Sequence, residues 1–97
     1  FGCKNYESPE ALVNDPAIDA VFVLTNLETH LEYTALALGA GKHVLVEKPV
    51  GVSVAEIERM KALADAKGLV CMPGHNYVYE QGMTRTRELV ENGDLGK

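Results

Sequence analysis

The sequence is poor in the residue types that mark several common classes of protein. Among its 97 residues there is no tryptophan, and the two cysteines, Cys3 and Cys71, are too far apart to form a CxxC pair. Cysteines at this spacing match no zinc or iron–sulfur motif, so we predict no metal site. We expect two reduced thiols, with a Cys3–Cys71 disulfide as the alternative.

Basic clusters and long apolar runs are lacking too. The formal net charge is −5 and Lys and Arg do not cluster, so neither nucleic acid nor an anionic membrane is expected as a partner. No apolar stretch approaches the roughly 20 residues of a membrane span, and the first residues do not resemble a signal peptide. The content of 46% hydrophobic and 24% charged residues is ordinary for a globular domain. We expect a cytoplasmic protein.

Three short apolar runs predict the strands of a parallel sheet. They cover residues 20–24, 43–46 and 69–72. Continuous apolar runs of this length are typical of strands that are buried on both faces. One amphipathic helical segment separates each run from the next, so the sequence predicts two consecutive βαβ units in an α/β fold.

The ends of the predicted helices are marked by capping residues. Ser8 and Pro9 begin a short first helix. The first crossover helix opens at 28–29, and Ser53 with Glu56 forms a capping box for the second. Gly68 should close that helix, and a last helix of about 12 residues should end at Gly93. The faces expected to be apolar are Leu31, Ala35 and Leu38, then Ile57, Met60, Leu63 and Ala64, and finally Met83, Thr86 and Val90.

Polar side chains follow each predicted strand. Parallel strands end at one edge of a sheet, and ligands of open α/β sheets bind there. We call this edge the rim. It should gather Thr25 and Asn26, Glu47 and Lys48, His75 and Asn76, and also His30 at the start of the next helix.

Each rim residue also has a structural interpretation. Thr25 or Asn26 could simply cap the following helix, and His30 could be a surface residue. Glu47 and Lys48 could form a solvated ion pair, and His75 could be a core or linker histidine. The residues alone therefore predict a ligand site without naming the ligand.

Four motifs carry a family resemblance. They are Thr25-(x)4-His30, the segment AGKHVLVEKP at 40–49, Gly74-His75-Asn76, and Gly93-Asp94-Leu95-Gly96. Their order and spacing resemble the Gfo/Idh/MocA oxidoreductases, the relatives of glucose–fructose oxidoreductase and inositol dehydrogenase. The chain departs from the family pattern at 26–27, at Val78 and at Gln81.

The resemblance implies a partial Rossmann fold, a doubly wound parallel sheet. Residues 1–74 would form part of an NAD(P)-binding domain that lacks its first βαβ unit. Residues 75–97 would form a linking helix that leads to an α+β substrate domain outside this chain. The resemblance also implies NAD or NADP as cofactor, a sugar or polyol as substrate, and a homo-oligomer for the full-length protein.

The resemblance assigns roles to the rim as well. Lys48 would be the catalytic residue that moves the hydroxyl proton during hydride transfer. Thr25, Asn26, His30, Glu47 and Lys48 would line the cofactor crevice. Two alternatives are a non-catalytic relative acting as a binding or scaffold protein, and an unrelated flavodoxin-like or response-regulator-like module. The flavodoxin-like or response-regulator-like module would need a phosphorylatable Asp or a flavin loop at a strand end, and the sequence has neither.

Overall fold

The centre of the molecule is a parallel sheet. A computed structural model describes residues 2–96. Strands β1 (Ala20–Val23), β2 (His43–Val46) and β3 (Cys71–Pro73) form one 3-stranded sheet in the order β1-β2-β3. All pairings are parallel, with Phe22 opposite Leu45 and Leu45 opposite Met72. The predicted α/β fold with a parallel sheet is confirmed.

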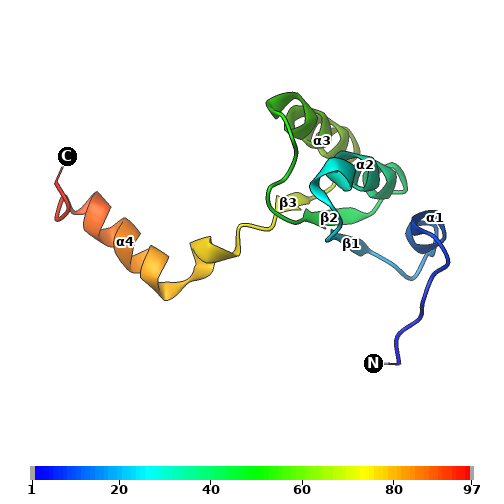
Figure 1. The fold of residues 1–97 in the computed structure, drawn as a ribbon, viewed down its shortest axis with the longest axis horizontal. Helices are drawn as coiled ribbons and strands as arrows, with labels where there is room; N and C mark the ends of the chain where they lie inside the picture. Colours follow the sequence, from blue (N-terminus) through cyan, green and yellow to red (C-terminus); the bar gives the residue numbers. More distant parts are fainter. Residues whose placement is uncertain (1, 97) are drawn as a thin grey trace.

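Two crossover helices cover one face of this sheet. Helices α2 (His30–Gly39) and α3 (Val54–Lys67) lie side by side, and the short helix α1 (Pro9–Val13) packs against α2 (Figure 1). Between helices and sheet lies a small apolar core, whose buried members are Val13, Val23, Ala37, Leu38, Val44, Val46 and Ala64.

The opposite face of the sheet is open in residues 2–96. Phe22 is 65% exposed and Met72 36% exposed, and half-buried Leu45 lies between them in register. The expectation that the strands are buried on both faces is therefore wrong for this chain. A strand is covered on both sides only when two layers pack on it, and the described residues supply one.

The predicted caps of α1 and α3 are confirmed, with one change in the capping box of α3. Ser8 Oγ accepts from the Ala11 N–H at 3.2 Å, and Ser53 Oγ accepts from the Glu56 N–H at 3.3 Å. The return bond of this capping box is displaced by one residue, because the Glu56 carboxylate accepts from the Val52 N–H at 2.9 Å. At the other end of α3, Gly68 has the left-handed φ of 63° that glycine adopts without strain.

The buried face of α2 differs from the predicted one. The helix is preceded by a 3₁₀ turn, η1 (Leu27–Thr29), so α2 itself begins two residues later than the predicted opening at 28. Its buried residues are His30, Thr34, Ala37 and Leu38, whereas Leu31 and Ala35 are only half-buried. In α3, Met60 and Ala64 are buried as predicted, but Ile57 is 42% exposed.

Strand β3 begins later and ends later than predicted. Leu69 still lies in the capping turn that follows α3, because its N–H donates to the Ala64 carbonyl at 3.0 Å. Val70 and Gly74 direct their bonds toward β2, so the nitrogen of Pro73 faces away from the ladder. A proline is accepted in an edge strand on that side, since no ladder bond is lost.

The last helix stands apart from the sheet. After the 3₁₀ turn η2 (Asn76–Tyr79), helix α4 (Gln81–Glu91) extends away from the other helices (Figure 1). None of its residues is buried, although the predicted cap at Gly93 is confirmed by a φ of 79°. Within residues 2–96, no helix has the length and apolar character required to cross a membrane.

Candidate functional site

Thr25 and Asn26 lie on an internally bonded turn that leaves β1. The Thr29 hydroxyl lies 2.8 Å from the Thr25 hydroxyl and 2.8 Å from the Asn26 carbonyl oxygen. The Thr29 N–H donates to the same carbonyl at 3.0 Å. Asn26 occupies the N-cap position of η1, but its side chain makes no capping bond. The Asn26 amide is therefore exposed at the rim and does not serve the helix.

Glu47 and Lys48 follow the central strand β2. The Glu47 N–H donates to the Val23 carbonyl at 3.0 Å and so continues the β1–β2 pairing. Lys48 is exposed, and among residues 2–96 its ammonium makes no hydrogen bond or ion pair. The solvated Glu47–Lys48 pair that the sequence allowed is not formed.

The other lysine of the AGKHVLVEKP segment has a structural role. Lys42 Nζ donates to the Asp15 carbonyl at 3.0 Å and to the Ile18 carbonyl at 2.7 Å. These contacts hold the loop that enters β1. Of these two lysines, only Lys48 is available to a ligand. The sequence alone did not show that Lys42 is occupied by backbone carbonyls.

Gly74 makes room for the Glu47 carboxylate. Its N–H donates to the Val46 carbonyl at 2.8 Å, and the residue is buried. A Cβ atom at this position would lie 2.6 Å from Glu47 Oε2. The sequence indicated Gly74 only as the end of a strand, so its contact with Glu47 is a feature that the sequence did not reveal. His75 and Asn76, which follow it, are exposed.

His30 lies beneath the rim. Its side chain is 2% exposed, with Nδ1 2.9 Å from the Pro49 carbonyl oxygen and Nε2 3.1 Å from the Thr25 carbonyl oxygen. Both ring nitrogens are therefore engaged by backbone. The surface interpretation of His30 is wrong, because the helix begins at this residue and turns its side chain inward.

Thr25, Asn26, Glu47 and Lys48 thus gather at one edge of the sheet. The His30 ring contacts both the turn after β1 and the segment after β2, so these two segments are neighbours. The exposed Asn26 amide and Lys48 ammonium and the half-buried Glu47 carboxylate together can donate to and accept from a polyhydroxylated ligand. No group of three His, Cys, Asp or Glu side chains within residues 2–96 could hold a metal ion.

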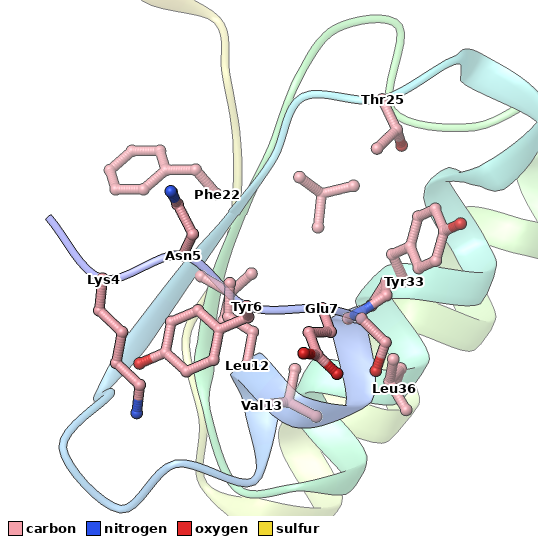
Figure 2. Close-up of a pocket in the computed structure, with 14 residues that line it drawn as sticks. Lys4, Asn5, Tyr6, Glu7, Leu12, Val13, Phe22, Thr25, Tyr33 and Leu36 are labelled. Carbon is pink, nitrogen blue, oxygen red and sulfur yellow. The ribbon is translucent and has the colours of Figure 1, made fainter.

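A cavity of about 510 Å³ lies elsewhere, along the outer side of β1. Residues 4–9 form one wall, and Tyr33 and Leu36 of α2 form another (Figure 2). Of the rim residues only Thr25 reaches it. Asp15 anchors the neighbouring N-terminal segment by accepting from Lys4 Nζ at 2.5 Å and Tyr6 Oη at 2.9 Å. Hydrogen bonds from Lys4, from the Ala17 N–H and from Tyr6 together lower the pKa of Asp15 to about 2.

The two cysteines are free thiols. Cys3 is exposed and Cys71 is half-buried on β3. Burial raises the pKa of the Cys71 thiol, because the thiolate would lose its hydration. Neither thiol belongs to the rim.

Known dehydrogenases and reductases are similar to this chain in sequence and structure. Myo-inositol 2-dehydrogenase of Thermotoga maritima is 34% identical over 94 residues, which cover 97% of this chain and 28% of that protein. D-xylose 1-dehydrogenase (NADP(+)) of Hypocrea jecorina is 38% identical, with 99% and 25% covered. A 3-ketoreductase of Actinomadura kijaniata, solved with TDP-benzene and NADP, superposes with a TM-score of 0.83 at 32% identity, covering 90% of this chain and 28% of that one.

The chain therefore spans between a quarter and three tenths of the length of these relatives. Residues 1–75 match the family described as oxidoreductase family, NAD-binding Rossmann fold. This match includes the whole sheet and all the rim residues up to His75. The chain belongs to the Gfo/Idh/MocA family of oxidoreductases.

Proposed function

We propose that this chain carries the proton-transfer residue of an NAD(P)-dependent oxidoreductase that acts on a hydroxyl group of a sugar or polyol. The observation that carries the proposal is the free, exposed ammonium of Lys48 at the carboxyl end of β2. Two relatives support the substrate class by name, since one is an inositol dehydrogenase and the other a xylose dehydrogenase.

The rim fits the nicotinamide end of NAD or NADP. The Asn26 amide can donate and accept, the Glu47 carboxylate accepts, and Lys48 donates, which suits ribose hydroxyls and a carboxamide. Thr25 holds the turn that presents Asn26. The sequence contains no GxGxxG turn, so the pyrophosphate would be held by residues outside this chain.

In this proposal Lys48 accepts or donates the proton that accompanies hydride transfer. The nicotinamide supplies the hydride acceptor or donor when it is bound. When the substrate carbon loses its hydride, the hydroxyl on that carbon must lose a proton, and the unprotonated Lys48 amine accepts it. In the reverse direction the Lys48 ammonium donates this proton to the carbonyl oxygen, whose developing negative charge it also stabilises.

Replacement of Lys48 in the intact enzyme tests this role. Lys48→Met keeps the length of the side chain and removes the amine, so kcat should fall on the order of 100- to 10,000-fold. The matched control is Lys61→Met, which removes an exposed lysine from α3 that forms an ion pair with Asp65. Steady-state kinetics with NAD(P) and a polyol measures both variants.

Equal kcat values for Lys48→Met and Lys61→Met would contradict the proposal. Absence of any NAD(P)-dependent turnover in the intact wild-type protein would favour the non-catalytic relative instead. The proposal also includes a homo-oligomer in the cytoplasm, a domain boundary at 74–75, and NAD or NADP as the cofactor.

A further inference from the structure

The His30 ring spans two segments of the rim. Nδ1 lies 2.9 Å from the Pro49 carbonyl oxygen, in the segment after β2, and Nε2 lies 3.1 Å from the Thr25 carbonyl oxygen, in the turn after β1. Carbonyl oxygens only accept, and a neutral imidazole carries one N–H, so the ring donates to one of these two carbonyls and packs its other nitrogen against the second. With the ring 2% exposed, water does not compete for these contacts.

One contact fixes the backbone before Lys48, and another fixes the backbone after it. The residue before it, Glu47, donates its N–H to the Val23 carbonyl at 3.0 Å. The residue after it, Pro49, presents its carbonyl to His30 Nδ1. The Lys48 side chain has no partner among residues 2–96, so its direction depends on how its backbone is fixed.

We propose that His30 is a positioning residue that sets Lys48 by donating its Nδ1–H to the Pro49 carbonyl, while Nε2 packs against the Thr25 carbonyl in the turn that carries Asn26. The proposal rests on the proposed function, because it takes Lys48 to be the proton-transfer residue. His30 itself touches neither substrate nor cofactor in this role. The resemblance implies a direct contact between His30 and the cofactor. We propose an indirect role instead, because both ring nitrogens already contact backbone carbonyls.

Two variants separate the two links. The side-chain amide nitrogen of asparagine lies near the position of Nδ1 of a histidine, and that of glutamine lies near Nε2. His30→Asn therefore retains a donor toward Pro49, and His30→Gln retains one toward Thr25. Thr34→Val is the matched control, because Thr34 lies one turn along the same buried face and its hydroxyl has no partner within residues 2–96.

Kinetics and hydrogen exchange of the intact enzyme give two independent readouts. His30→Gln should lower kcat on the order of 10- to 100-fold, as a small misplacement of a catalytic group does. His30→Asn should retain most of kcat, and Thr34→Val all of it. Amide exchange of segment 46–52 should rise in His30→Gln and stay at the wild-type level in His30→Asn.

Equal exchange in the Asn and Gln variants would overturn the proposal, as would faster exchange in Thr34→Val than in His30→Gln. Faster exchange in His30→Gln with unchanged kcat would also overturn it, because the bond would then not position Lys48 for catalysis. The proposed function fails separately, if Lys48→Met and Lys61→Met have equal kcat values.

Discussion

At Gly74 the backbone passes directly over the Glu47 carboxylate. An alanine here would place Cβ 2.6 Å from Glu47 Oε2 and 3.3 Å from the Val46 carbonyl oxygen. The carboxylate is the end of a flexible side chain, so we expect Glu47 to move while the sheet stays folded. Loss of one hydrogen bond of about 1 kcal/mol would raise the Kd for NAD(P) in the intact enzyme about fivefold.

Isothermal titration calorimetry measures this change in Kd. Gly82→Ala is the control, because nothing lies within 4 Å of its added Cβ. If both alanine variants bind NAD(P) as tightly as the wild type, Glu47 does not contact the cofactor from its present position.

Individual rim residues were predictable where they follow a strand directly. Glu47 and Lys48 lie where the carboxyl-end rule puts them, because Val44 and Val46 define β2 unambiguously. His30 was not predictable in the same way. Its burial depends on where α2 begins and on a carbonyl 19 residues away, and neither is visible in the local pattern.

At the scale of elements, β1 has a free outer side. The Asp19 and Val23 carbonyls accept from β2, so the N–H and carbonyl of Phe22 face away from the sheet. Such an apolar edge pairs readily with another strand. We therefore expect the 97-residue chain, expressed alone, to dimerise or aggregate through β1.

Phe22→Pro should reduce this self-association, because it removes the outward N–H without breaking the β1–β2 ladder. Phe22→Ala is the matched control, since it removes the same ring and keeps the N–H. Light scattering measures the mass of each. A monomeric wild-type chain, or equal association of the two variants, would refute pairing through this edge.

The sequence predicted the existence and order of the helices and strands better than their exact bounds and their buried faces. Ser8, Ser53 and Gly68 act locally, so their caps could be read directly. The predicted buried face of α2 differs from the observed one because an apolar pattern favours Leu31 over His30. The ring nitrogens of His30 find their partners only through tertiary contacts. The apolar pattern ends the third strand at 72, before Pro73, because only the pairing with β2 shows that the Pro73 nitrogen faces outward.

At the scale of the whole molecule, the proposed function gives this chain one end of a cofactor site. In that proposal the rim contacts the nicotinamide and ribose, and the sequence contains no GxGxxG turn for the pyrophosphate. We therefore expect the 97-residue chain alone to show no measurable NADH binding in a calorimetric titration. Micromolar binding would contradict this, and the intact enzyme in the same titration is the positive control.

The position of Gly74 also has a mechanical consequence. The segment that leaves β3 touches the Glu47 carboxylate at Gly74 and then continues through η2 to α4, which is free of the sheet (Figure 1). The chain therefore links α4 to the rim through a single close contact. A displacement of α4 that reached Gly74 would move the Glu47 carboxylate, because the backbone at Gly74 leaves that carboxylate no spare room.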